Sequence, residues 1–220
     1  RKIKYRPFLV KEEKILIIAM ESQDTKQIAR AVKDVLAKCI LTKGIKVDKL
    51  ATFDIEYLFL NIRGKSVGEQ IEVMVTCPDD GKTQVPMSIN IDDIKVQKDK
   101  GHSSDIVLDD TYTLKMKYPS LNEFIKTNFD QIEQMKVDDT FDLISSCIDQ
   151  VYSDEETWSH QECTKKELSD FVESLNTSQF KLVENFFTTM PKLSHMVKVT
   201  NPNTKVDSEI KLEGLQSFFA

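Results

Sequence analysis

The sequence predicts an α+β fold that is mostly helical, with two small antiparallel β-hairpins near residues 70–92 and 194–213 and one further strand near 110–118. Apolar residues recur three or four positions apart over most of the first 66 residues and again over 119–192, as in amphipathic helices. Elsewhere apolar and polar residues alternate, as in half-buried strands. Since 40% of the 220 residues are hydrophobic, the chain can bury a core without a disulfide or a metal.

The N-terminal region contains three expected helices. In the clearest one, apolar residues share one face and most of the basic residues lie elsewhere. That face consists of Ile28, Ala31, Val32, Val35, Leu36 and Cys39. Asp24 suits its N-cap and Gly44 its C-terminal stop. A shorter helix is expected over 11–20, and a third begins near Thr52 and ends before Gly64.

The spacing then changes to that of strands. Residues 71–77 and 85–91 alternate in polarity on either side of the turn Cys77-Pro78-Asp79-Asp80-Gly81-Lys82, which predicts a hairpin. A polar loop is expected over 97–105, and a strand over 111–118.

Helical spacing returns after Pro119, a residue that suits the first turn of a helix. An acidic loop over 153–163 carries Trp158, the single tryptophan. Thr164 and Glu167 then have the spacing of a capping box. The expected helices cover residues 121–132, 141–151, 168–175 and 178–190.

The last of these helices has an unusually wide apolar face. A core face is already provided by Phe180, Val183, Phe187 and Met190. Leu182 and Phe186 add a second apolar flank. A stripe this wide indicates either a deeply buried helix or one that offers a face to a partner.

The chain closes with a second hairpin whose turn resembles the first. Val73-Met74-Val75-Thr76-Cys77-Pro78-Asp79 and Val197-Lys198-Val199-Thr200-Asn201-Pro202-Asn203 match at five positions if Asp and Asn are equivalent. This similarity indicates either an internal helix–hairpin repeat or two turns with the same chemistry. The regions are 1–66 (helical), 67–118 (β-rich), 119–192 (helical) and 193–220 (hairpin and tail), in one compact domain or two tightly packed halves.

Composition excludes several classes of function. Asp and Glu total 36 against 30 Lys and Arg, a net charge of −6, whereas nucleic-acid binders usually show a basic excess or patch. We therefore expect no nucleic-acid partner. The longest apolar run, over 15–20, is far shorter than the ~18 residues of a membrane span, so none is expected. The four scattered cysteines are expected to be free thiols in a reducing cytosol.

Catalytic signatures are missing from the sequence. It has no glycine-rich phosphate loop, no Gly-x-Ser-x-Gly and no His-Glu-x-x-His. His102, His160 and His195 fall outside any motif that would make them bases. We expect no catalytic residue, no cofactor and no enzymatic activity. The alternative is an enzyme whose carboxylate site is assembled only by the fold.

One turn has half of a zinc-binding motif. Cys77-Pro78-Asp79-Asp80 has the position and turn of a zinc knuckle, but Asp80 replaces the second thiolate. The matching turn Asn201-Pro202-Asn203-Thr204 has no sulfur, and His160 with Cys163 lacks a second pair. Because structural zinc needs four ligands, no metal is expected, and Cys77 is the candidate ligand that remains. A degenerate zinc-ribbon-like nucleic-acid-binding module is the corresponding alternative function.

Apolar and aromatic residues at several places suggest protein binding instead. Basic residues at the chain start alternate with Tyr5 and Phe8, which favours a flexible arm that docks on another protein. Phe218 and Phe219 either pack on the protein's own core or contact a partner. The partner-binding candidates are Tyr5, Arg6, Phe8, Leu182, Phe186, Phe218 and Phe219.

Several segments in order carry a family resemblance. The N-terminal half has Lys4-Tyr5-Arg6-Pro7-Phe8-Leu9-Val10-Lys11-Glu12-Glu13-Lys14, Thr52-Phe53-Asp54-Ile55-Glu56-Tyr57-Leu58-Phe59-Leu60 and Arg63-Gly64-Lys65-Ser66-Val67-Gly68-Glu69. The C-terminal half adds Thr164-Lys165-Lys166-Glu167-Leu168, Phe186-Phe187, Thr189-Met190-Pro191, Leu212-Glu213-Gly214-Leu215 and Phe218-Phe219. Together they resemble the baseplate hub protein family of T-even-type contractile-tailed phages.

The resemblance implies a non-enzymatic protein needed to build the central hub of the tail baseplate, as a structural subunit or an assembly chaperone. It implies phage baseplate hub proteins as partners, with a homo-oligomer as a further option. The implied location is the host cytoplasm during assembly, or the tail baseplate of the virion. Some family members have a zinc-knuckle-like turn near Cys77, from which the lone cysteine departs.

Overall fold

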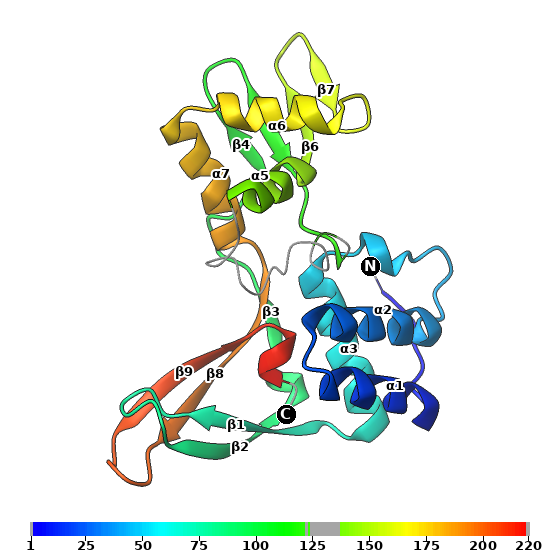
Figure 1. Ribbon diagram of the computed structural model, residues 1–220, viewed down its shortest axis with the longest axis vertical. Coiled ribbons are helices and arrows are strands. Elements are labelled where there is room, and N and C mark those ends of the chain that lie inside the picture. The colour runs from blue at the N-terminus through cyan, green and yellow to red at the C-terminus, as the bar shows by residue number, and fades with distance from the viewer. Residues whose placement is uncertain (1, 122, 124–136, 219–220) are drawn as a thin grey trace.

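The computed structural model describes residues 2–121, 123 and 137–218. It confirms the α+β class, with helices and three small antiparallel sheets. Figure 1 shows two lobes. The lower lobe in that view holds three N-terminal helices beside two β-hairpins, and the upper lobe holds a small sheet covered by three helices.

The lower lobe begins with the three predicted helices, α1 (Val10–Glu21), α2 (Thr25–Cys39) and α3 (Thr52–Val67). Asp24 caps α2 as predicted, because its carboxylate accepts hydrogen bonds from the backbone N–H groups of Lys26 and Gln27. A short 3-10 helix, η1 (Val47–Lys49), precedes α3. The three helices enclose a common core that includes Val32, Val35, Leu36, Cys39, Ile55, Phe59 and Ile62.

Two predicted helix ends are wrong. The helix α3 does not stop before Gly64 but continues through it. A Cβ on residue 64 would lie 3.2 Å from Ile91 Cδ1, so this glycine permits close packing rather than ending the helix. The helix ends at Val67, and its C-cap Gly68 has φ of 119°. The helix α2 already ends at Cys39, before Gly44, because the next residue has an extended backbone and forms a β-bridge to the N-terminal segment.

Both predicted hairpins of the lower lobe are confirmed. They are β1 (Gln70–Thr76) with β2 (Gln84–Asn90), and β8 (Lys192–Thr200) with β9 (Asp207–Glu213). The short strand β3 (Lys95–Gln97) pairs with β8. The 3-10 helix η2 (Ile91–Asp93) connects β2 to β3, and the 3-10 helix η4 (Leu215–Phe218) follows β9. The hairpins run beside one another (Figure 1) and share a core with Leu60 of α3. That core includes Ile71, Val73, Val75, Ile89, Leu193, Val197 and Phe218.

The upper lobe is a four-stranded antiparallel sheet with helices. Its strands, in spatial order, are β4 (Asp105–Val107), β5 (Thr113–Met116), β6 (Ile148–Tyr152) and β7 (Thr157–Ser159). Its helices are α5 (Val137–Ser146), α6 (Lys165–Ser174) and α7 (Thr177–Thr189). The predicted capping box at Thr164 and Glu167 is confirmed at the start of α6. The enclosed residues include Leu114, Ile148, Val172, Val183 and Phe186.

Two predictions for this lobe need correction. The helix predicted over 141–151 ends at Ser146, and its last residues form β6. This strand lies between β5 and β7, and β5 precedes it by more than 30 residues, so its conformation depends in part on a partner distant in sequence. The loop predicted over 153–163 contains β7, whereas the loop predicted over 97–105 is confirmed between β3 and β4. Most of the helix predicted over 121–132 lies outside the described residues.

An aromatic cluster joins the lobes. The rings of His102, Tyr118 and Phe186 have centroids 5.1–5.6 Å apart, and Tyr118 stacks on each of the other two. Tyr118 also meets Phe53 of α3 edge-on. Nδ1 of His102 lies 2.9 Å from Oγ1 of Thr189 and Nε2 lies 3.0 Å from the Tyr118 hydroxyl. Because the Thr189 hydroxyl already donates to a backbone carbonyl of α7, Nδ1 carries the proton and Nε2 accepts one from Tyr118.

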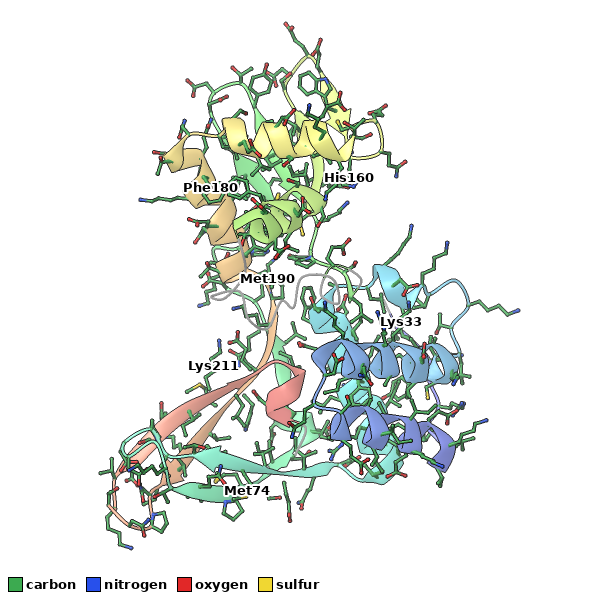
Figure 2. The ribbon with its side chains drawn as sticks, in the orientation of Figure 1. Lys33, Met74, His160, Phe180, Met190 and Lys211 are labelled. Carbon is green, nitrogen blue, oxygen red and sulfur yellow. The ribbon has the colours of Figure 1, made fainter. Side chains whose placement is uncertain are left out.

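The chain passes several times between the lobes. The segment 67–118, predicted to be one β-rich region, supplies strands to all three sheets. Figure 2 places Met190 between the lobes, where α7 leads into β8.

Candidate protein-binding surfaces

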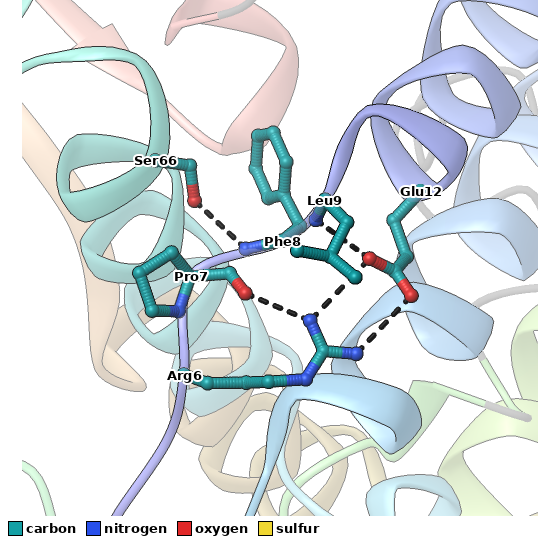
Figure 3. A network of polar contacts seen from close by, with 6 residues as sticks. All are labelled: Arg6, Pro7, Phe8, Leu9, Glu12 and Ser66. Carbon is teal, nitrogen blue, oxygen red and sulfur yellow. Dashed lines mark hydrogen bonds and ion pairs between the residues drawn. The ribbon is translucent and has the colours of Figure 1, made fainter.

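The N-terminal segment is attached to the helical body rather than free. The Arg6 guanidinium contacts both carboxylate oxygens of the buried Glu12, at 3.1 and 3.4 Å, and donates to the Pro7 carbonyl at 2.8 Å (Figure 3). The backbone N–H of Leu9 donates to Glu12 at 2.6 Å. The hydrogen bonds from Arg6 and from Leu9 lower the pKa of Glu12. Arg6 therefore holds the start of α1 in place.

Tyr5 and Phe8 are attached as well. Tyr5 forms an antiparallel β-bridge with Ile40 and packs against the helical core. Phe8 is buried, and its backbone N–H donates to Ser66 Oγ at 3.0 Å. The flexible arm predicted for this segment is therefore corrected, because backbone and side-chain bonds fix it to α2 and α3. Tyr5 also lines a cavity of about 440 Å³ with Leu50, Asp54 and Tyr57, and desolvation raises the pKa of Asp54 there.

The aromatic candidates in the second half are mostly interior. Phe186 is 2% exposed and Phe218 is 1% exposed, so their side chains belong to the cores of the two lobes rather than to the surface. Phe219 lies outside the described residues. On α7 only Leu182, at 44%, remains as an exposed large apolar side chain. The wide apolar face of α7 is thus chiefly a buried face.

An exposed apolar stripe on α1 was not among the predicted sites. It consists of Leu9, the N-cap of α1, and of Val10, Ile17 and Ile18 of the helix, which are all more than half exposed, with Val10 at 80%. The exposed Lys14 lies between the two pairs along the helix. The opposite side of α1 buries Leu16 and Ala19 against the core, so this helix is apolar on both sides. The six consecutive apolar residues over 15–20 were the available signal, because one face of a helix cannot bury all of them.

The upper lobe has an apolar groove of about 300 Å³. Its lining is Tyr112, Val151, Trp158, Cys163, Glu167, Leu168 and Phe171. Tyr112 and Trp158 are each 40% exposed, and their ring centroids are 6.1 Å apart. Acidic segments, Asp109-Asp110 and Asp154-Glu155-Glu156, adjoin both rings in sequence. An exposed aromatic pair over an apolar floor is typical of a protein-binding anchor site.

Among the described residues, no group of three or more His, Cys, Asp or Glu side chains is placed to hold a metal ion. Cys39, Cys77 and Cys147 are buried free thiols, and Cys163 is a partly exposed one. No helix in residues 2–121, 123 and 137–218 is both long and apolar enough to cross a membrane.

The architecture is thus a two-lobed α+β protein with exposed apolar surfaces on both lobes, as expected of an assembly component. A family model described as "T4 bacteriophage base plate protein" matches residues 1–220, and the chain belongs to that family. No curated protein and no solved structure matches it significantly. Membership indicates a structural phage protein of the tail baseplate that associates with other baseplate proteins, in a family that is generally non-enzymatic.

Proposed function

We propose that this protein acts without catalysis in assembly of the baseplate hub, by binding other baseplate proteins in the host cytoplasm. The observation that carries the proposal is the family match over the entire chain. The resemblance of its N-terminal and C-terminal segments to hub proteins supports the hub in particular.

Two surfaces are suited to such binding. The α1 stripe offers three large apolar side chains on the helix and a fourth at its N-cap. The helix is already anchored by the Arg6–Glu12 pair, so docking would not require ordering of the helix. The Trp158 groove offers an aromatic anchor beside acidic segments. We propose that the stripe receives an apolar face of one baseplate hub protein, and that the groove receives an apolar side chain flanked by basic residues.

Co-expression with the baseplate hub proteins of the same phage, followed by size-exclusion chromatography, tests this function. We expect one hub protein to co-elute with the chain. The double variant Ile17→Ser/Ile18→Ser should release it, whereas Met196→Ser, which removes an equally exposed apolar side chain from β8, should not. Trp158→Ser tests the groove in the same way. Elution of the chain alone, or only as a homo-oligomer, beside every hub protein would contradict the proposal.

The two modes of action, structural subunit and chaperone, differ in where the protein remains. Mass spectrometry of purified particles and of infected-cell lysate separates them. Detection in both indicates a structural subunit, and detection only in lysate indicates an assembly chaperone.

A further inference from the structure

The two lower hairpins begin their connections with the same five-residue turn, although the connection over 77–83 is one residue longer than that over 201–206. The N–H of Gly81 donates to the Cys77 carbonyl, and the N–H of Lys205 donates to the Asn201 carbonyl, both at 2.9 Å. Gly81 has φ of 64° and Lys205 has φ of 63°. Since a lysine rarely adopts positive φ, the second turn keeps the shape of the first without its glycine.

The two turns also bond to each other across more than 120 residues of sequence. The side-chain amide of Asn201 donates to both carboxylate oxygens of Asp79 and to Asp80 Oδ2, each at 3.0 Å. The Thr204 hydroxyl also donates to Asp79. Asn203 donates to Thr83 Oγ1 at 3.0 Å. We call this set of bonds between the hairpin ends the tip latch.

The latch includes three of the four sequence positions that two facing Cys-x-x-Cys turns would use. In a Cys-x-x-Cys pair, the ligands would stand at positions 77 and 80 of one turn and 201 and 204 of the other. Three of these four side chains, those of Asp80, Asn201 and Thr204, already take part in bonds between the turns. The fourth, Cys77, is fully buried in the first turn.

The residues at these positions do not fit zinc. Cys77 is the single thiol of the four, whereas structural zinc sites of this kind use four Cys or His ligands. Asn201 and Thr204 direct hydrogen-bond donors at the Asp79 and Asp80 carboxylates. A cation there would compete with donors that already satisfy the two negative charges.

We propose that the tip latch is a metal-free counterpart of a paired zinc knuckle, in which two carboxylates, an amide and a hydroxyl join the hairpins where a metal ion would. The need for a joint follows from the architecture. Two-stranded hairpins are marginally stable alone, and these ends lie at the far side of the lobe from the helices (Figure 1). The hairpins share a core with Leu60 of α3, and the latch joins their turns at the ends away from that helix.

The first test replaces the donor and keeps the turn. In Asn201→Asp, the remaining Oδ1 can still accept from the backbone N–H groups of Asn203 and Thr204, as it does now. The variant loses the amide donor and places a third carboxylate beside Asp79 and Asp80. We expect amide hydrogen exchange of Cys77 and Gly81 to accelerate by at least about tenfold, as for loss of a charge-assisted hydrogen bond.

The matched control is Asn185→Asp on the exposed side of α7, which makes the same chemical change away from the tip. It should leave exchange at Cys77 and Gly81 unchanged. Equal exchange in Asn201→Asp and the wild type would overturn the latch. Restoration of slow exchange by the reciprocal variant Asp79→Asn/Asn201→Asp would support it, since that variant re-forms an amide–carboxylate pair with the roles reversed.

The second test concerns the metal. The wild type should contain no stoichiometric zinc by elemental analysis, and a chelator should not change exchange at the tip. With Cys77, the variant D80C/N201C/T204C completes four thiols and should bind one Co²⁺ per chain with cobalt–thiolate absorption, whereas D80S/N201S/T204S should not. Two results would overturn the proposal that the latch is a metal-free counterpart of a paired zinc knuckle. One is stoichiometric zinc in the wild type, and the other is a triple-cysteine variant that folds by circular dichroism but binds no cobalt. If that variant does not fold, the reciprocal Asp79/Asn201 variant decides the proposal.

Discussion

The two lobes are built from the chain in different ways. The upper lobe uses residues from β4 to α7, which follow one another between β3 and β8, apart from an excursion in which Ser120 bridges to Ala51. The lower lobe combines the first helices with the last hairpin, and Phe218 packs in one core with Leu60. The upper lobe can therefore form from nearly continuous sequence, whereas the lower lobe needs both ends of the chain. We expect the lobes to unfold as separate units.

The largest expected effect tests whether the two lobes unfold independently. Phe59→Ala removes a fully buried ring from the helical core of the lower lobe and should cost about 3–5 kcal/mol. Hydrogen exchange should accelerate in α1–α3 and stay near the wild-type rate in β5 and β6. Tyr57→Ala, an exposed position on the same helix, is the control and should change little. Equal acceleration in both lobes would show that they unfold together.

The next largest effect concerns the attachment of α1. Arg6→Gln leaves the buried Glu12 carboxylate without its charged partner, and Tm should fall clearly at neutral pH. Because Arg6 and Leu9 lower the folded-state pKa of Glu12, the stabilisation is present above its ordinary pKa of 4.5 and is lost as the pH falls through the folded-state value. The difference in Tm between wild type and variant should therefore narrow on acidification, measured by thermal melts from pH 7 to pH 3. A constant difference would rule out this linkage.

A smaller effect is expected where the lobes meet. Burial lowers the pKa of His102 below its ordinary value of 6.5, with nearby Lys98 acting in the same direction and Asp99 opposing it. The unfolded chain then binds the proton more strongly, so stability falls as the pH drops from above 6.5 through the folded-state pKa. His102→Gln should reduce this slope between pH 7 and pH 5 in melts monitored by aromatic circular dichroism, leaving the part due to His160, whose pKa is also lowered by burial. An unchanged slope in the variant would show that His102 does not contribute to it.

The smallest effect is expected at Gly64. Gly64→Ala gains about 1 kcal/mol of helix propensity but brings a Cβ to 3.2 Å from Ile91 Cδ1, so the two contributions should nearly cancel. Gly64→Val has a larger clash and should be clearly less stable in urea denaturation. Ile91→Ala removes the side chain that the valine would meet. Gly64→Val should therefore cost less free energy of unfolding in the Ile91→Ala protein than in the wild type.

Local signals predicted most elements. The cap at Asp24, the capping box at Thr164 and the two alternating hairpins were predicted correctly, because each depends on residues within a few positions of one another. The strand β6 was not, since apolar residues at 148 and 151 also fit a helix, and only pairing with β5 and β7 makes them a strand.

The candidate sites also show what local sequence patterns can predict and what depends on tertiary packing. Sequence spacing marked α7 as having a wide apolar face but could not show that Phe186 lies inside while Leu182 lies outside. It also counted Arg6 as a surface residue, although Arg6 pairs with a buried carboxylate. The exposed stripe on α1 was missed because its apolar residues look like core residues until their neighbours are known.

Composition and local order alone were sufficient for the α+β class, the hairpins, the capped helix starts and the absence of known catalytic motifs, because these depend on residue type and short spacing. The joining of two similar turns into the tip latch, the exposure of α1 and the distribution of strands between the lobes depend on which distant segments pack together. Such contacts join residues more than a hundred positions apart, so their geometry comes from the folded arrangement and not from any local pattern.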